Sequence, residues 1–388
     1  MPMKITDVKA LRVVYPNPSK ASYAMVRPLD IYPRFKKAPG GPPPAMASAA
    51  FIKVETDEGI SSLIRAGGPY IGGELQAHIA SNYLKPILLG EDPFNVEMLW
   101  DQMFKASFGY GRKGAVIMAM SLIDSALWDI IGKAKKEPVY RLLGGRTRDR
   151  IRCYASHLHP LPSEELASEA QGYVEEGYTA MKMRFIAGPA DGLPGMDRNF
   201  ELVKVVRDAI GYGIELMADC WTSWSLPYAI KMIRRLERFE LSWVEEPLPP
   251  DDIEGYIRLR KLVETPISAG EHEYTLLGFK ELITRGAVDI VQPDVTWCGG
   301  ITEIRKVCAL AEAFDVQVIP HASAPPSLHL IMSQKPTVCP MAEYLTKYAI
   351  HEFEKNPIKP KGGYIELPDN PGLGVELDEE LIKRYLVA

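Results

Sequence analysis

The stretch of residues 215–294 decides the fold. It holds four short apolar runs that each end in a carboxylate: ELMAD at 215–219, LSWVE at 241–245, TPISAGE at 265–271 and VDIVQPD at 288–294. Short buried runs separated by longer helical stretches are typical of strands in a parallel sheet. The stretch therefore predicts a repeated β-α unit.

The same alternation extends on both sides of that stretch. Further strand candidates are residues 178–185, 317–321 and 341–345, and helical patterns separate most of them. So many units favour a closed parallel barrel over an open doubly wound sheet. We expect an α/β protein whose residues 134–354 form a (β/α)7β barrel, a modified TIM barrel.

The chain before residue 134 has a different pattern. Residues 5–14 and 49–55 alternate between apolar and polar positions, as strands of an antiparallel sheet do, and residues 73–133 have helical periodicity. These features predict a small α+β domain over residues 1–133.

A long segment rich in Pro and Gly, residues 15–44, joins the first two predicted strands. Loops of this length are uncommon and often cover an active site, so we interpret the segment as a lid. A disordered insertion is the alternative.

Composition excludes several classes of protein. The 388 residues include 45 Lys and Arg against 50 Asp and Glu, and no basic stripe with interleaved aromatic residues, so we expect neither a nucleic-acid partner nor a membrane partner. The five cysteines form no C-x-x-C pair, which argues against a disulfide framework or a zinc ribbon. The N-terminus lacks a long apolar segment, and we expect a cytoplasmic protein with a small-molecule partner.

Ionisable side chains stand at the ends of successive predicted strands. They are Lys182 and Arg184, then Asp219, Glu245, Glu271, Asp294, His321 and Glu343. From Asp219 onward they are 22 to 27 residues apart, close to one β-α unit. Because the carboxyl ends of barrel strands meet at one rim, we expect these groups to converge in an active site.

Three of these groups, Asp219, Glu245 and Glu271, are carboxylates on neighbouring strands. Like charges in a partly buried site raise one another's pKa, so a cation is needed to balance them. Oxygen ligands favour a hard ion, with Mg²⁺ as first choice and Mn²⁺ as second. Three independent salt bridges are the alternative interpretation.

Asp294 and His321 lie one unit apart. A carboxylate bonded to an imidazole fixes the tautomer and raises the basicity of the ring, so the pair predicts a general base. A packed core histidine is the alternative for His321. Glu343 is expected to hold a proton and donate a hydrogen bond to a developing enolate oxygen, or to form a salt bridge at the barrel end.

These residues, together with the strings around them, resemble the mandelate racemase branch of the enolase superfamily. The strings that carry the resemblance are Val244-Glu245-Glu246-Pro247, Ala269-Gly270-Glu271, Gln292-Pro293-Asp294, Pro320-His321 and Ile123-Asp124-Ser125-Ala126-Leu127-Trp128-Asp129. Within that branch, Asp219-Cys220-Trp221, Gly270-Glu271-His272-Glu273 and Trp297-Cys298-Gly299-Gly300 look most like the acid-sugar dehydratases of the L-rhamnonate dehydratase family.

The resemblance implies roles that agree with the reasoning from residues. It implies Mg²⁺ on the three carboxylates, His321 as base with Asp294 as its partner, and Glu343 as hydrogen-bond donor. It also implies that residues 355–388 return to complete the N-terminal capping domain. A homo-oligomer, commonly an octamer, is implied as well.

One departure bears on the reaction. Racemases of this branch resemble one another in a Lys-x-Lys pair, whereas this chain has Lys182 and Arg184. A guanidinium is essentially never deprotonated in a protein, so two-base racemisation is disfavoured. One histidine can instead remove the α-proton of a sugar acid and return a proton to the departing β-hydroxyl, which predicts a hydro-lyase that forms a 2-keto-3-deoxy acid.

Two alternatives stay open. An epimerase or racemase could use Lys182 as an unexpected second base, and a non-catalytic binding protein could keep the barrel without turnover. For substrate contacts we expect His272 and, in the loop, Arg27 and Arg34. The loop lacks the histidine that rhamnonate dehydratases share there, so five- and six-carbon aldonates other than L-rhamnonate stay open too.

Overall fold

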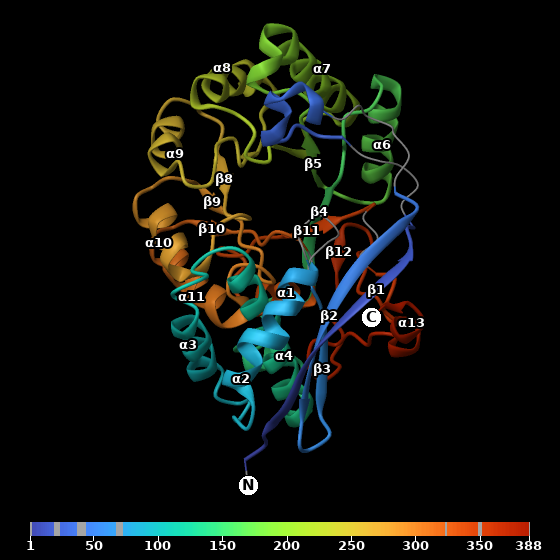
Figure 1. Ribbon diagram of the computed structural model, residues 1–388. Helices are drawn as coiled ribbons and strands as arrows, with labels where there is room; N and C mark the ends of the chain where they lie inside the picture. The colour runs from blue at the N-terminus through green and yellow to red at the C-terminus, as the bar shows by residue number, and fades with distance from the viewer. Residues whose placement is uncertain are drawn as a thin grey trace.

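Two sheets organise the chain in the computed structural model, which describes residues 2–18, 24–36, 44–66, 73–322, 324–347 and 351–387. Figure 1 shows the helices α6 to α10 around a ring of strands, and a smaller body of β1 to β3 with α1 to α4 below it. The N-terminus and the C-terminus both lie on that smaller body.

The smaller sheet is antiparallel, with strand order β13-β1-β2-β3. Its strands are β1 (Ile5–Pro16), β2 (Met46–Thr56), β3 (Ser61–Ala66) and β13 (Leu386–Val387). The last strand pairs Val387 with Arg12 of β1, so the end of the chain lies in the same sheet as its beginning.

A group of helices packs against this sheet and against one another. They are α1 (Gly73–Ile79), η3 (Ala80–Leu84), α2 (Lys85–Leu88), α3 (Val96–Ala106) and α4 (Ala115–Lys135). By length and composition α4 could cross a membrane, but 94% of its apolar window is buried inside the protein. It is apolar on all sides because the sheet and the barrel helix α11 (Gly300–Ala313) pack against it from different directions.

The larger sheet has nine strands, of which eight are parallel and follow the order β10-β9-β8-β7-β6-β5-β4-β11. The strands are β4 (Ile151–Ser156), β5 (Ala180–Arg184), β6 (Glu215–Asp219), β7 (Val244–Glu245), β8 (Ile267–Ala269), β9 (Ile290–Val291), β10 (Gln317–Val318) and β11 (Ala342–Leu345). The ninth strand, β12 (Tyr364–Ile365), pairs antiparallel with β4. The predicted α/β barrel architecture is confirmed.

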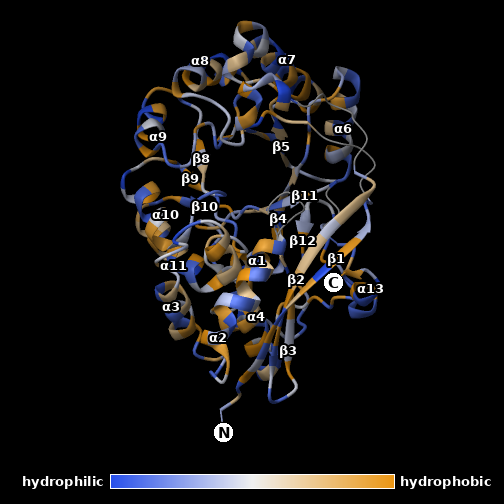
Figure 2. Ribbon diagram, viewed as in Figure 1, coloured by the Kyte–Doolittle hydropathy of each residue, from blue (hydrophilic) through white to orange (hydrophobic). Residues whose placement is uncertain are grey.

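Short and long helices precede, connect or follow these strands. They are α5 (Val139–Leu142), α6 (Ser163–Glu175), η4 (Pro189–Asp191), α7 (Gly192–Ile210), α8 (Leu226–Leu236), η5 (Glu237–Phe239), α9 (Ile253–Arg260), α10 (Thr275–Thr284), α11, α12 (Pro325–Ser333) and α13 (Glu379–Arg384). In Figure 2 the outer helices such as α9 and α10 carry both hydrophilic and hydrophobic residues, as expected of helices with one face on a sheet.

Several strands end earlier than the apolar runs predicted. β9 and β10 stop before Pro293 and Pro320, which lack the backbone N–H that a ladder needs. β8 stops before Gly270, whose φ of +137° is outside the strand region. As a result Glu271, Asp294 and His321 follow their strands by two or three residues and stand on the loops at the rim.

Apolar side chains fill the opposite end of the barrel. One buried cluster there consists of Tyr154, Ala180, Met217, Trp243, Ile290, Ile319 and Met341. Because these side chains come from strands all around the sheet, they close the interior and leave the ionisable groups at the carboxyl rim.

Candidate active site

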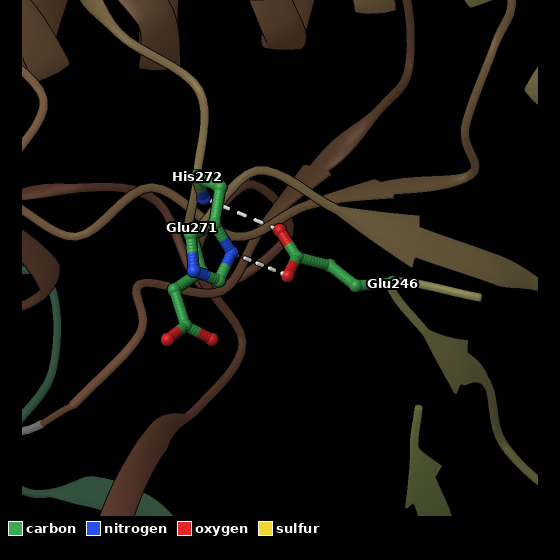
Figure 3. Close-up of side chains that lie close together, drawn as sticks. All are labelled: Glu246, Glu271 and His272. Carbon is green, nitrogen blue, oxygen red and sulfur yellow. Dashed lines mark hydrogen bonds and ion pairs between the residues drawn. The ribbon is translucent and has the colours of Figure 1, made fainter. Parts of the chain in front are cut away.

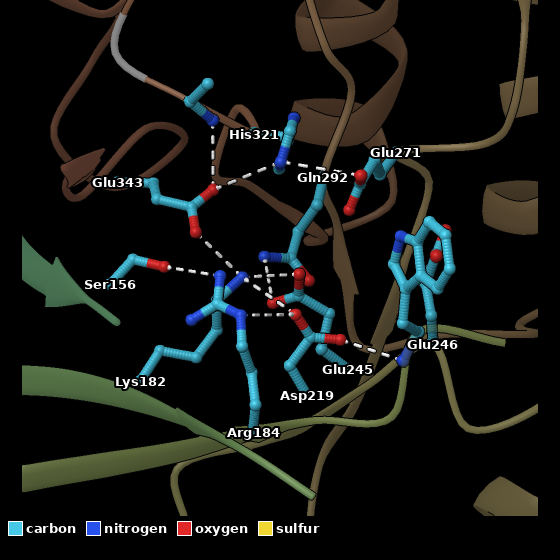
Figure 4. Close-up of polar contacts among 12 residues, drawn as sticks. Ser156, Lys182, Arg184, Asp219, Glu245, Glu246, Glu271, Gln292, His321 and Glu343 are labelled. Carbon is cyan, nitrogen blue, oxygen red and sulfur yellow. Dashed lines mark hydrogen bonds and ion pairs between the residues drawn. The ribbon is translucent and has the colours of Figure 1, made fainter. Parts of the chain in front are cut away.

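Lys182, from β5, lies between three of the predicted carboxylates (Figure 4). Its Nζ is 2.5 Å from Oε1 of Glu245, 2.8 Å from Oε1 of Glu343 and 3.8 Å from Oδ2 of Asp219. Burial alone would lower the pKa of Lys182, but Glu245 and Glu343 outweigh it and hold the pKa well above its ordinary value. Lys182 is therefore a fixed positive charge.

Arg184, two residues further on the same strand, is held by the end of β4. Its Nη1 donates a hydrogen bond of 2.8 Å to the carbonyl oxygen of His157, and its Nη2 donates one of 3.0 Å to Oγ of Ser156. Its Nε lies 3.8 Å from Oδ2 of Asp219. The guanidinium is buried and oriented by the backbone of a neighbouring strand.

His321 and Asp294 form the predicted pair. Nδ1 of His321 lies 2.9 Å from Oδ2 of Asp294, and Oδ1 of Asp294 accepts hydrogen bonds from the backbone N–H and the hydroxyl of Thr296 at 2.7 and 2.6 Å. The other ring nitrogen, Nε2, is 3.5 Å from Oε1 of Glu271 and 3.9 Å from Oε2 of Glu343. Nε2 therefore faces the centre of the site.

The negative charges around His321 change its protonation. Burial alone would lower its pKa, but the carboxylates of Glu271, Glu343 and Asp294 raise it to about 10. A proton held on this ring is stabilised until some of that negative charge is neutralised.

Glu343, from β11, makes the ion pair that the sequence left open beside the role of proton donor, since its Oε1 is 2.8 Å from Nζ of Lys182. Its Oε2 accepts a hydrogen bond of 2.9 Å from the backbone N–H of Ala322. Burial would raise its pKa, but Lys182 and His321 outweigh it and hold the pKa below the ordinary value. In this charge arrangement Glu343 is a carboxylate.

The three carboxylates predicted to bind metal are buried at the rim. Asp219 Oδ1 accepts from the backbone N–H of Trp221 at 2.9 Å, and Glu245 Oε2 accepts from Nε2 of Gln292 at 2.8 Å. Burial raises the pKa of Glu245 to about 7 and also raises the pKa of Glu271. The pKa of each carboxyl is raised although Lys182 lies beside Glu245 and His321 beside Glu271.

The number of charged groups in the site shows how much positive charge is lacking. The buried carboxylates are Asp219, Glu245, Glu271, Asp294 and Glu343, and the cationic groups among them are Lys182, Arg184 and protonated His321. Two negative charges are left without a partner even when His321 carries its proton. The donor set therefore fits a hard divalent cation.

A second group shares Glu271 with the predicted metal ligands. Ligand atoms of Glu246, Glu271 and His272 lie within 4.8 Å of one another. Figure 3 shows the Glu246 carboxylate facing His272, while the Glu271 carboxylate points away from both. His272 Nδ1 is 2.6 Å from Oε2 of Glu246, which raises the pKa of His272 to about 9 against the effect of burial. With that proton, His272 forms an ion pair with Glu246.

The Glu246–His272 pair connects the loops after β7 and β8. Oε1 of Glu246 also accepts from the backbone N–H of His272 at 3.2 Å, and Glu246 itself has a φ of +40°, rare for a residue with a side chain. Glu246 is not among the site residues predicted from the sequence. The sequence offers one signal for this pair: Glu246 is next to Glu245, and His272 is next to Glu271.

Aromatic rings border the site beside His321. The ring of Trp297 is 5.3 Å from that of His321 and 6.4 Å from that of His272, and the ring of Trp221 is 5.9 Å from that of His272. His272, expected to contact substrate, is thus at the same edge of the site as the predicted base.

The predicted lid is described in part, since residues 19–23 and 37–43 lie outside the described chain. The backbone N–H of Val26 donates to the carbonyl oxygen of Phe185 at 2.8 Å, so residues 24–36 lie over the end of β5. Arg27 pairs with Asp30 at 2.8 Å, and Arg34 stacks 4.5 Å from the centre of the Phe35 ring. Both contacts lie within the loop and include none of the strand-end groups.

Comparisons with known proteins give matches over most of the chain. The family model described as "Enolase C-terminal domain-like" matches residues 165–381, and that described as "Mandelate racemase / muconate lactonizing enzyme, N-terminal domain" matches residues 44–144. An L-rhamnonate dehydratase of Saccharopolyspora erythraea is 35% identical over 398 residues, which cover 98% of each chain.

Solved structures of the same architecture carry different activities. A rhamnonate dehydratase from Gibberella zeae complexed with Mg is 30% identical, with a TM-score of 0.85 over 100% of this chain and 96% of that one. The 3,6-anhydro-D-galactonate cycloisomerase from Zobellia galactanivorans is 31% identical, with a TM-score of 0.82 over 99% of this chain and 100% of that one. The chain belongs to the mandelate racemase / muconate lactonizing enzyme family of the enolase superfamily.

Proposed function

We propose that the protein is a Mg²⁺-dependent sugar-acid dehydratase, a hydro-lyase of the L-rhamnonate dehydratase type. The observation that carries the proposal is the contrast between two sides of the site. The base side, His321 with Asp294, has a ring nitrogen facing the centre. The cation side, Lys182 with Arg184, has positive charges fixed by hydrogen bonds and ion pairs.

Asp219, Glu245 and Glu271 would hold the metal, with Mg²⁺ first and Mn²⁺ second. When bound, the ion supplies positive charge that stabilises the developing enediolate of the substrate carboxylate. Glu245 is 2.5 Å from Lys182 in the present arrangement, so its side chain would share its charge between the two partners.

His321 removes the α-proton through Nε2. Asp294 keeps the proton on Nδ1, which leaves Nε2 as the basic atom. Its pKa of about 10 is set largely by Glu271, Glu343 and Asp294. Neutralising the charge of Glu271 lowers that pKa and frees Nε2 to act as a base near neutral pH.

The cation side binds the substrate carboxylate and takes no proton. Lys182 keeps its proton because Glu245 and Glu343 raise its pKa well above the ordinary value, and Arg184 cannot lose one at neutral pH. Both stabilise negative charge as the α-carbon is deprotonated. A substrate carboxylate near Glu343 also raises the pKa of Glu343, which would let it hold the proton that hydrogen-bonds the enediolate.

Elimination completes the reaction on the face of His321. The protonated Nε2 returns its proton to the β-hydroxyl on the same side, and the C–O bond breaks to release water. The enol that is left tautomerises to a 2-keto-3-deoxy acid. The balance is one sugar acid giving one keto acid and one water, by syn elimination.

Fewer contacts in the structure bear on which sugar acid is the substrate. His272 at the aromatic edge, with Arg27 and Arg34 in the loop over β5, are the proposed substrate contacts. The domain limits of 1–133 with 355–388 and of 134–354 are likewise proposed. Homo-oligomeric assembly and a cytoplasmic location stay predictions from the sequence.

A second candidate is favoured by the likeness to the anhydro-galactonate cycloisomerase. If the atom leaving C3 is a ring ether oxygen instead of a hydroxyl, the same two proton transfers open the ring and release no water. The relative that matches 98% of each chain is an L-rhamnonate dehydratase, so dehydration is our first choice.

A substrate screen tests the proposal. Purified protein with Mg²⁺ is incubated with aldonic and aldaric acids, L-rhamnonate among them, and with 3,6-anhydro-aldonates, and the 2-keto product is detected as its semicarbazone. We expect a signal from an aldonate that disappears with EDTA and in His321→Asn. A signal from anhydro acids alone establishes the second candidate, and α-deuterium exchange with no keto product establishes epimerisation.

A further inference from the structure

Two buried thiols outside the active site lie in contact. Sγ of Cys308, in α11, is 3.9 Å from Sγ of Cys339, and both residues are fully buried. The two sulfurs are in van der Waals contact, and a disulfide bond of about 2.0 Å requires that they approach further.

The position of this pair in the barrel is specific. The hydrogen-bonded strand order begins at β10 and ends at β11, so among the described residues the ladder does not join these two strands. A backbone hydrogen bond of 2.8 Å from Val318 of β10 to the carbonyl oxygen of Val338 crosses this seam. Cys339 is the next residue after Val338, and Cys308 lies on the helix that leads into β10.

The backbone around the pair is fixed. The N–H of Cys339 donates to the carbonyl oxygen of Lys335 at 2.9 Å, and its carbonyl oxygen accepts from Nη1 of Arg148 at 2.6 Å. Cys308 lies within the 14-residue helix α11. Since neither end can move far, the two thiols stay in contact in the folded protein.

We propose that Cys308 and Cys339 form an intrachain disulfide that closes the barrel seam when the protein meets a peroxide. One thiol is oxidised by hydrogen peroxide to a sulfenic acid with release of water. The second sulfur attacks that sulfur and a second water leaves. Two thiols and one peroxide thus give one disulfide and two waters.

The expected consequence is a more stable barrel. The bond links residues 31 positions apart, and a cross-link of that span restricts the unfolded chain. We expect the Tm to rise by about 5 °C after oxidation. The contact that Cys339 makes with Cys308 raises the pKa of Cys308, and burial adds to this, so we expect oxidation to be slow.

Peptide mapping of the whole folded protein tests the proposal. The protein is treated with hydrogen peroxide, its remaining thiols are alkylated under denaturing conditions, and proteolytic peptides are weighed with and without reductant. We expect one reducible cross-link, between the peptides that carry Cys308 and Cys339. Cross-links only between other cysteines, or none before the protein unfolds, would overturn the proposal.

Calorimetry of three variants adds a second readout. Cys308→Ala and Cys339→Ala should lose the oxidation-dependent rise in Tm, while Cys153→Ala, which removes a buried thiol on β4, should keep it. A rise that persists in both of the first two variants contradicts the proposal. If those variants do not fold, peptide mapping of the protein without substitutions still tests whether the disulfide forms.

Discussion

The two sides of the active site contain basic groups of opposite behaviour. On the cation side, Lys182 has a side chain only 1% exposed and lies between Glu245 and Glu343. On the base side, His321 has a side chain 13% exposed and presents Nε2 to the centre. The comparison shows that a basic side chain close to carboxylates does not necessarily act as a general base. A base also needs one nitrogen that can reach substrate and a pKa that the charge of the site can bring down.

Replacing the base should have the largest effect. His321→Asn removes the proton acceptor and leaves the predicted ligands Asp219, Glu245 and Glu271 in place. We expect dehydration to fall by about 10³- to 10⁴-fold, with α-proton exchange lost and Mg²⁺ affinity retained. Dehydration rates and isothermal titration with Mg²⁺ measure the two properties separately. Loss of Mg²⁺ binding in this variant would mean that the site had been disrupted.

Removing the metal should affect both sides at once. Without a divalent ion, two negative charges in the buried site lack partners, so EDTA should abolish turnover and lower the Tm. Adding Mg²⁺ back should restore both, and the rise in Tm should depend on its concentration. A Tm that is indifferent to Mg²⁺ would contradict the assignment of the three carboxylates.

Asp294→Asn alters the base without removing it. An amide cannot hold Nδ1–H of His321 as a carboxylate does, so we expect kcat/KM to fall by about 10²- to 10³-fold. Because the base acts in its neutral form, kcat/KM rises with pH through the pKa of His321. Asp294 helps to raise that pKa, so the rise should move to lower pH in the variant. A pH–rate profile from pH 5 to pH 10 measures the direction.

Loss of the Glu246–His272 ion pair should reduce activity less than loss of the base, because its effect is on Mg²⁺ binding. Glu246→Gln and His272→Gln remove the charges that join the loop after Glu245 to the loop that carries Glu271, and we expect Mg²⁺ affinity to fall by about 10- to 100-fold. Titration calorimetry measures this independently of turnover. Lys204→Met, which breaks an exposed ion pair with Asp208 on α7, is the matched control and should leave Mg²⁺ affinity unchanged.

Arg184→Lys should have the smallest effect and the most informative one. The lysine loses the paired contacts with Ser156 and the carbonyl of His157, so we expect about a tenfold loss of dehydration. If the cation side serves only to hold charge, the product should stay the same. Chromatography of the remaining sugar acid would reveal any new C2 epimer, which is the sign of a second base.

Much of the fold followed from the sequence because the β-α spacing is regular. The intervals of 22 to 27 residues placed Asp219, Glu245, Glu271, Asp294, His321 and Glu343 at one rim. Figure 4 shows the others together there, and Asp294 lies 2.9 Å from His321. The first barrel strand, β4, was not among the predicted strands. Ser156 and His157, the partners of Arg184, lie at the end of that strand. The spacing of the predicted strands therefore did not indicate them.

Other features depend on three-dimensional packing and left little trace in the sequence. The ionised state of Glu343 follows from its contact with Lys182, two strands away around the sheet. The ion pair of Glu246 with His272 needs a left-handed residue after β7. The loop arginines Arg27 and Arg34 were chosen for charge alone, and their described contacts are with Asp30 and Phe35.

Turnover in D₂O tests the single-base account most directly. The substrate found in the screen is converted part-way by the Mg²⁺-loaded enzyme, and the remaining acid and the keto acid are examined by NMR. The account predicts that the remaining acid keeps its configuration at C2, whether or not deuterium has entered there. Deuterium at C2 in the epimer of the starting acid would show proton transfer from the cation side and contradict the account.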